Sequence, residues 1–174
     1  MPVPDIDFAR LTLRDALDLA ILIEEEAQER YLEFAHQMEI HHTPEAGGFF
    51  VFMAQKEARH GEELRARRKR LFEGQLSAVT RAMLWDVEAP DYDEARAFMT
   101  PRQAMQTALR AEEKAHGFFV AALPWIGDSD VKRLFEELRD EEVHHQDLVK
   151  QELAKLPPDP GVGPEDFVDE PVGH

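Results

Sequence analysis

Glutamate and histidine residues recur in this chain of 174 residues at a spacing that suits metal binding. A single glutamate is followed further along the chain by a Glu-x-x-His pair, and the same arrangement then occurs a second time. The residues concerned are Glu24, Glu57, His60, Glu112, Glu142 and His145. Because residues three positions apart lie on one face of an α-helix, each pair can direct both side chains at one metal ion. The repeat therefore predicts two similar sets of metal ligands.

The position of each pair within the hydrophobic pattern separates it from ordinary surface residues. Six Glu-x-x-His pairs occur in the sequence, but only Glu57 with His60 and Glu142 with His145 fall at the apolar positions of a helical repeat. Residues at these positions of an amphipathic helix face the protein core. The two single glutamates fall at such positions as well, so all six side chains are expected to point inward.

Four glutamates that face one core need positive charge nearby, because an unpaired buried carboxylate is costly. Two divalent cations would balance four carboxylates and leave both histidines neutral, as metal ligands must be. Mixed carboxylate and imidazole ligands suit iron or manganese better than zinc, copper or calcium. A buried layer of salt bridges is the alternative. It needs a basic residue at the same level, and the candidate on these faces, Arg67, lies roughly two to three helical turns from Glu57.

The composition is that of a folded protein, with 43% hydrophobic and 32% charged residues. The formal net charge of −16 disfavours binding to nucleic acid or to an anionic membrane. No apolar run approaches the roughly 20 residues that a membrane-spanning helix needs, and the first residues lack the pattern of a signal peptide. The absence of cysteine excludes disulfides and thiolate metal sites and favours a cytoplasmic location.

Hydrophobic residues at intervals of three and four predict four long helices. Thr12, Thr43, Thr100 and Asp128 stand at the expected helix starts, and proline follows the second and third of them. Residues 75–99 form a long crossover, which fits two helical hairpins joined so that the second and third helices run parallel. The prediction is an all-α four-helix bundle over 12–156. Residues 1–11 are expected to be an N-terminal extension, and 157–174 a disordered acidic tail rich in proline and glycine.

Four segments of the chain resemble the ferritin-like di-iron superfamily, in particular its rubrerythrin and erythrin branch. They are the segments Ala20 to Glu24, Phe50 to His60, Ala108 to Glu112 and Phe135 to His145. The resemblance covers roughly residues 12 to 155 and implies a ferritin-like bundle that holds two iron ions, with manganese as the other metal considered. In this family pattern, Glu24 and Glu112 are terminal ligands. Glu57 and Glu142 bridge the two ions, and His60 and His145 each complete one ion.

Two features depart from the rubrerythrin pattern. Rubrerythrins carry an extra carboxylate one turn after the ligand on the third helix, where this chain has Ala115. They usually carry a four-cysteine rubredoxin iron as well, and this chain has no cysteine. The set of six ligands is closer to that of bacterioferritin-type sites. The chain is also similar to the soluble domain of membrane-anchored ferritins of the erythrin type.

Tyr31 is the candidate catalytic residue. It lies seven residues after Glu24 on the same helical face, and its counterpart in the second repeat is Phe119. A phenol beside a di-iron centre can hydrogen-bond to a ligand or donate an electron. Packing in the core with a satisfied hydroxyl is the alternative. In the fourth helix only His145 keeps the apolar register, so His144 is expected to be exposed.

These features indicate a di-iron oxidoreductase of ferroxidase or peroxidase type, with Fe2+ and either O2 or H2O2 as substrates. The expected partners are an external electron donor and further copies of the chain, as a dimer or larger homo-oligomer, and neither nucleic acid nor a membrane. Two alternatives stay open. One is a di-iron oxygenase that acts on an organic substrate. The other is a non-catalytic bundle that buffers metal or binds a protein cargo.

Overall fold

The computed structural model describes residues 6–84 and 100–158, and four long helices make up most of this part. They are α1 (Leu13–Ile40), α2 (Pro44–Phe72), α4 (Pro101–Ala122) and α5 (Ser129–Lys155). Three short 3-10 helices, η1 (Phe8–Arg10), η2 (Arg81–Leu84) and η3 (Leu123–Trp125), lie outside them. No strand occurs within the described residues, and the predicted all-α fold is confirmed. None of these described helices has the length and hydropathy needed to cross a membrane.

The helices begin at the predicted capping residues, with one difference in how a cap is used. The Thr12 side chain accepts a hydrogen bond of 3.2 Å from the backbone N–H of Asp15, and Thr100 forms a complete capping box at the start of α4. Thr43 precedes α2, as predicted, but makes no side-chain cap there. Its hydroxyl instead donates to the carbonyl of Met38, 3.1 Å away at the end of α1. Thr43 therefore closes the turn between α1 and α2.

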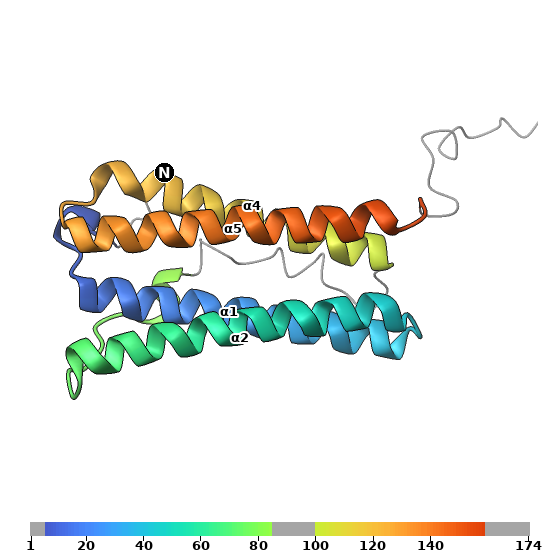
Figure 1. Ribbon diagram of the computed structural model, residues 1–174, viewed down its shortest axis with the longest axis horizontal. Coiled ribbons are helices and arrows are strands. Elements are labelled where there is room, and N and C mark those ends of the chain that lie inside the picture. The colour runs from blue at the N-terminus through green and yellow to red at the C-terminus, as the bar shows by residue number, and fades with distance from the viewer. Residues whose placement is uncertain (1–5, 85–99, 159–174) are drawn as a thin grey trace, which may run out of the picture.

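The four helices form an elongated bundle of two hairpins (Figure 1). The most extensive contacts join α1 to α2 and α4 to α5, and smaller contacts join α1 to both helices of the other hairpin. Helices α2 and α4 run in the same direction, as the long crossover predicts. The bundle of two hairpins is therefore confirmed. The crossover from residue 85 to 99 and the expected tail from residue 159 onward lie outside the described residues.

The hydrophobic core has two parts, one toward each end of the bundle. The first core cluster includes Leu17, Phe119 and Phe135, and the second core cluster includes Phe34, Phe50 and Met53. On α1, Ile23 belongs to the first cluster and Tyr31 to the second, with Glu24 between them. The other three helices pass from one cluster to the other in the same way, with the repeated glutamates in between. A polar layer therefore divides an otherwise apolar interior.

A largely buried ion pair holds the end of α2 against the start of α1. Arg68 Nε lies 2.8 Å from Asp18 Oδ1, and little of either side chain is exposed. The same guanidinium donates hydrogen bonds to the carbonyls of Phe72 and Gln75, where the chain leaves α2. Because the buried charges satisfy each other and nearby backbone groups, this pair fixes the geometry of the hairpin at the end away from its turn.

Candidate metal centre

The six residues that the sequence predicts as metal ligands all reach the layer between the two core clusters. They are Glu24 on α1, Glu57 and His60 on α2, Glu112 on α4, and Glu142 and His145 on α5. Five of them are buried, and His60 keeps 19% of its side chain exposed. The bundle thus brings together residues from four helices, as the repeated spacing predicts.

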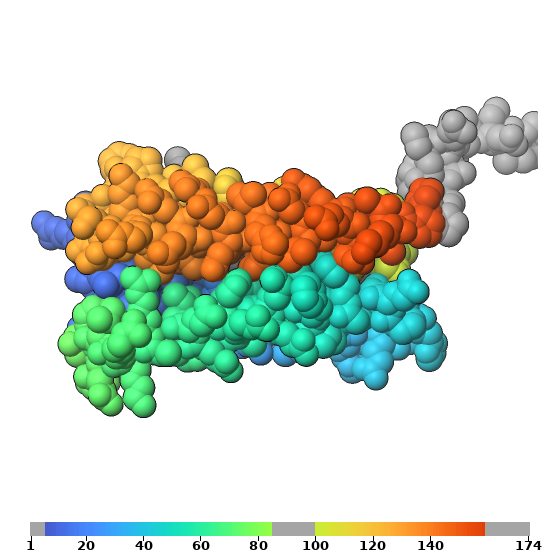
Figure 2. Space-filling model, in the orientation of Figure 1, coloured from blue at the N-terminus to red at the C-terminus, as the bar shows by residue number. Residues whose placement is uncertain are grey.

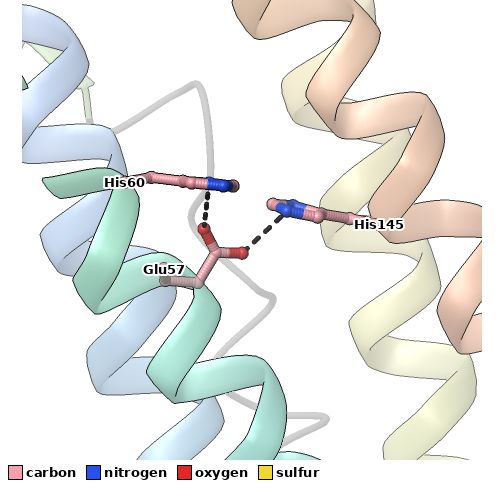
Figure 3. A group of neighbouring side chains, drawn as sticks. All are labelled: Glu57, His60 and His145. Carbon is pink, nitrogen blue, oxygen red and sulfur yellow. Dashed lines mark ion pairs between the residues drawn. The ribbon is translucent and has the colours of Figure 1, made fainter. Parts of the chain in front are cut away.

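The Glu57 carboxylate lies between the two histidines (Figure 3). Its Oε1 is 3.1 Å from His145 Nδ1, and its Oε2 is 4.0 Å from His60 Nδ1. The two imidazole rings are stacked, with centroids 5.4 Å apart and an angle of 9° between their planes. Two metal ions, one beside each histidine, would therefore each meet a different oxygen of this carboxylate.

Two groups of three residues flank this carboxylate, and each group contains one histidine. We name them the first half-site, which is Glu24, His60 and Glu141, and the second half-site, which is Glu112, Glu142 and His145. Within each group, one ligand atom from every residue lies within 4.8 Å of the others. Each half-site therefore offers two carboxylates and one imidazole, a mixture that suits iron or manganese.

The sequence pattern does not single out Glu141, which the structure adds to the first half-site. Its Oε2 lies 3.4 Å from His60 Nδ1, although 39% of its side chain is exposed. Burial, together with the negative charge of Glu24, raises the pKa of Glu141 to about 7. Glu141 precedes the buried Glu142 by one position and so lies at the edge of the apolar face of α5. Glutamates also stand directly beside predicted ligands at positions 25 and 113, so this sequence signal does not by itself select Glu141.

Several buried polar atoms of the centre have no hydrogen-bond partner but are suited to binding a cation. His145 Nδ1 and Nε2, His60 Nδ1 and Glu24 Oε2 are all shielded from solvent and make no hydrogen bond. Buried polar atoms are normally hydrogen-bonded, and groups that are not require an explanation. A carboxylate oxygen and the unprotonated nitrogen of a neutral imidazole are lone-pair donors, which a divalent cation would satisfy. The residues present therefore fit the metal ions that the sequence predicts.

Without a cation, the carboxylates on α1 and α2 hold protons more tightly than usual. Burial raises the pKa of Glu57 well above its usual value, and the charge of Glu24 and a hydrogen bond to Glu24 add to this effect. Burial also raises the pKa of Glu24, although its contact with Glu57 partly offsets the shift. A proton shared between these two carboxylates relieves the repulsion that two buried negative charges would produce.

The second half-site behaves in the opposite way, because its groups attract each other. Burial alone would raise the pKa of Glu112, but interactions with His145, Glu142 and Tyr31 lower it to about 2. Burial alone would likewise lower the pKa of His145, but its interaction with Glu112 and other nearby negative charges raise it. In the absence of metal, the contact between Glu112 and His145 therefore favours the charged form of both groups.

Tyr31 is fully buried and donates a hydrogen bond from its hydroxyl to Glu112 Oε1. Burial and the negative charges of Glu112 and Glu57 raise its pKa well above its usual value, so the phenol stays protonated and can donate. Its counterpart Phe119 packs in the first core cluster and has no hydroxyl. The hydroxyl is therefore satisfied by a predicted metal ligand, which is one of the roles that the sequence suggests for it.

Two neighbours of the centre take the positions that the sequence predicts. His145 is buried while the adjacent His144 is exposed, which is the register indicated by the apolar pattern of α5. Ala115, one turn after Glu112, is buried and brings no ligand atom to the centre. The additional carboxylate of this centre is therefore supplied by α5, through Glu141, and not by α4.

Comparison with known proteins identifies a matching family and similar folds. Residues 15–153 match the sequence model of the family named Rubrerythrin. The crystal structure of an uncharacterized conserved protein from Magnetospirillum magnetotacticum MS-1 is similar, with 30% sequence identity and a TM-score of 0.71, and the match covers 86% of this chain and 98% of that chain. A hypothetical protein from Pyrococcus furiosus, at 22% identity and a TM-score of 0.54, shares the fold over 88% of this chain and 94% of that chain. No protein of curated function matches.

Proposed function

Because the chain belongs to the rubrerythrin family, whose members bind iron at di-iron sites, we propose that it is a di-iron oxidoreductase that oxidises Fe2+ with O2 or H2O2. The observation that supports this most directly is the position of Glu57, with one oxygen toward each histidine and a three-residue group on either side. The six predicted ligands, namely Glu24, Glu57, His60, Glu112, Glu142 and His145, would hold the two ions. Iron is the proposed metal, and manganese is the alternative that the same ligands would accept.

Bound iron supplies the redox chemistry, since each Fe2+ gives up one electron. With peroxide, two Fe2+ ions, one H2O2 and two protons yield two Fe3+ ions and two water molecules. The protein contributes ligand geometry and an apolar shell on both sides of the polar layer. That shell keeps water away from the buried ligands of the centre and so strengthens their electrostatic interactions.

The residues of the chain have separate tasks in this proposal. Cations compete with protons for Glu24 and Glu57, because burial raises the pKa of both carboxyl groups. Tyr31, the candidate catalytic residue, acts through Glu112, whose carboxylate it orients by donating a hydrogen bond. Tyr31 is therefore a positioning residue in this proposal.

Turnover requires the ferric product to be removed or reduced again. In the ferroxidase route, Fe3+ leaves the centre as product and fresh Fe2+ replaces it. In the peroxidase route, an external donor returns the electrons, because the chain has no cysteine with which to build a rubredoxin-type relay. The absence of such a relay favours the ferroxidase route, in which Fe2+ itself is the electron source.

The test is an anaerobic titration of metal-free protein with Fe2+, followed by rapid mixing with O2 or with H2O2. We expect two Fe2+ ions per chain and an increase in ferric absorbance that needs no partner protein. Repeated consumption of peroxide is expected only after an external reductant is added. If metal binds but neither oxidant produces ferric iron, the redox proposal is wrong and metal buffering becomes the better account.

The oxygenase alternative needs an apolar pocket beside the ions. A cavity of about 610 Å³ lies at the turn between α1 and α2 and is lined by residues such as Leu32, His36, Thr43 and Val51. None of its lining residues belongs to the candidate centre. This cavity therefore gives no support to oxidation of an organic substrate at the centre.

A further inference from the structure

The first half-site contains a carboxylate that the repeat does not explain. The offset that relates Glu57 to Glu142 and His60 to His145 pairs Glu141 with Lys56. Lys56 is positively charged, and its Nζ lies 5.5 Å from the ring centroid of Phe52. Phe52 is exposed, so the charge of Lys56 contacts a surface residue. At this position of the repeat, α5 therefore has an acidic residue beside the centre, and α2 does not.

Glu141 meets two groups that are suited to sharing a cation with it. Its Oε2 is 3.4 Å from His60 Nδ1, which in turn is 3.9 Å from Glu24 Oε2. Glu24 is buried, and its Oε2 makes no hydrogen bond. The three atoms therefore surround one small volume, and one of them is a shielded carboxylate oxygen without a hydrogen-bond donor. A divalent cation in this volume would be bound from α1, α2 and α5 at once.

The same half-site is the one that meets solvent. Glu141 has 39% of its side chain exposed and His60 has 19%, whereas His145 in the second half-site has 1%. Helices α2 and α5 meet along the face of the molecule shown in Figure 2. Glu63 on α2 and Glu137 on α5 are exposed and close enough for their charges to act on Glu141. Arg67 lies 3.8 Å from Glu137 and offsets part of its charge. Glu63 and Glu141 thus supply the negative charge that would attract cations at the boundary between the two helices.

We propose that Glu141 is a seventh metal ligand, which receives a divalent cation from solvent between α2 and α5 and binds it together with Glu24 and His60. This inference rests on the proposed metal centre and adds an asymmetry to it. The first half-site fills from solvent through Glu141. The second half-site, which is Glu112, Glu142 and His145, is buried.

The test uses Mn2+ as the probe, with the free ion counted by electron paramagnetic resonance and the binding rate followed by stopped flow. We expect the unmodified chain to bind two ions. Glu141→Gln should bind one ion as before and the other at least about 10-fold more weakly and more slowly. The matched control is Glu113→Gln, which makes the same chemical change at an exposed residue adjacent to another predicted ligand. It should behave like the unmodified chain.

A second variant separates coordination from general attraction by charge. Glu141→Asp keeps the negative charge but shortens the side chain by one methylene group, so a ligand role predicts weaker binding of one ion. Binding of two ions with unchanged affinities and rates by both Glu141 variants would overturn the role of Glu141 and leave the metal centre standing. Failure of the unmodified chain to bind two ions would instead overturn the metal centre, and this inference with it.

Discussion

His60 and His145 occupy equivalent positions in the two hairpins, yet their surroundings differ. His145 has 1% of its side chain exposed and interacts with Glu112, whereas His60 has 19% exposed and lies near Glu141. Burial lowers the pKa of His60, and the charge of the neighbouring His145 lowers it further. The pKa of His145 is raised, because the attraction of Glu112 and other carboxylates outweighs burial. The pKa of the histidine is therefore lowered in the first half-site and raised in the second.

The difference comes from residues that do not follow the repeat. Tyr31 donates a hydrogen bond to Glu112 in the second half-site, while its counterpart Phe119 can donate none. Glu141 borders the first half-site, while its counterpart is Lys56. A repeated set of ligands can therefore produce one half-site that is enclosed and held by hydrogen bonds and another that stays open to solvent.

The contrast between the two half-sites assumes that Glu57 contributes a ligand oxygen to each of them. We expect Glu57→Ala to weaken the binding of both ions by more than about 100-fold, because this carboxylate approaches both histidines. The matched control is Glu62→Ala, which removes an exposed glutamate from the same helix. Isothermal titration with Mn2+ under anaerobic conditions measures both ions. Loss of a single ion in Glu57→Ala would show that the half-sites are independent.

Glu142 allows a sharper version of this experiment. The family resemblance assigns it a bridging role, like that of Glu57, but the structure groups it with Glu112 and His145 only. If Glu142 bridges, Glu142→Ala will weaken the binding of both ions, as is expected of Glu57→Ala. If it serves the second half-site alone, one ion will be lost and the other kept. The number of ions that remain distinguishes the two roles.

Substitution of each histidine tests which ion that histidine binds. We expect His145→Ala to weaken one ion by about 10- to 100-fold, and His144→Ala to change nothing, because His144 is exposed on the surface of α5. His60→Ala should weaken the other ion, so that each single variant keeps one strong site. Equilibrium dialysis against Mn2+, followed by metal analysis, gives the occupancy. A loss in His144→Ala in place of His145→Ala would show that the ligand register of α5 is shifted by one residue.

The fold could be predicted from the sequence because its signals are local and repeated. The apolar spacing identified four helices, and Thr12 and Thr100 begin helices with the predicted cap hydrogen bonds. The position of Glu24 and its equivalents at core positions of these helices placed the candidate centre, because a helix face fixes which side chains point inward. Thr43 was placed correctly at a helix start, but its hydroxyl bonds to Met38, which depends on how the chain turns.

Glu141 could not be found in the same way, because its role depends on tertiary packing. At the edge of the apolar face of α5, its side chain could face either water or a neighbouring helix, and the packing of α2 against α5 decides this. The hydrogen bond between Tyr31 and Glu112 is also a contact between distant helices. The sequence predicts that Tyr31 lies on the core-facing side of its helix, but it does not identify the hydrogen-bond partner of the hydroxyl. Periodicity determines the face of a helix, whereas packing determines the contacts at its edges.

Replacing Tyr31 by Phe would make the second half-site resemble the first. The hydroxyl donates to a buried carboxylate, and hydrogen bonds to charged groups contribute about 1.5–3 kcal/mol. We expect Tyr31→Phe to raise the pKa of Glu112, to lower the stability of the metal-free protein by up to this amount, and to weaken only the ion of the second half-site. Urea unfolding and Mn2+ titration measure these effects. Equal weakening of both ions would show that Tyr31 supports the bundle as a whole.

The smallest expected effect is the dependence of metal-free stability on pH, which reports the protons held by the first half-site and by Glu57. The pKa of Glu24, Glu57 and Glu141 is raised above 4.5, and for Glu141 it reaches about 7. Such groups stabilise the folded state fully below pH 4.5, and this contribution is lost as pH rises through their folded pKa values. Glu112, with a pKa of about 2, has the opposite sign, but its contribution is already complete above pH 4.5.

We therefore expect the free energy of unfolding of the metal-free protein to fall between pH 5 and pH 8. His60, whose pKa is lowered, opposes this fall only below its usual pKa of 6.5. His145, whose pKa is raised, adds to the fall above pH 6.5. Added Mn2+ should stabilise most at pH 8, where it meets ionised carboxylates and does not compete with protons. Thermal unfolding at several pH values, with and without Mn2+, measures both trends, and Glu57→Gln should show a shallower fall. A melting temperature that is constant over this range and unaffected by Mn2+ would mean that these carboxylates are hydrated in solution, so that the two half-sites do not differ in the way described above.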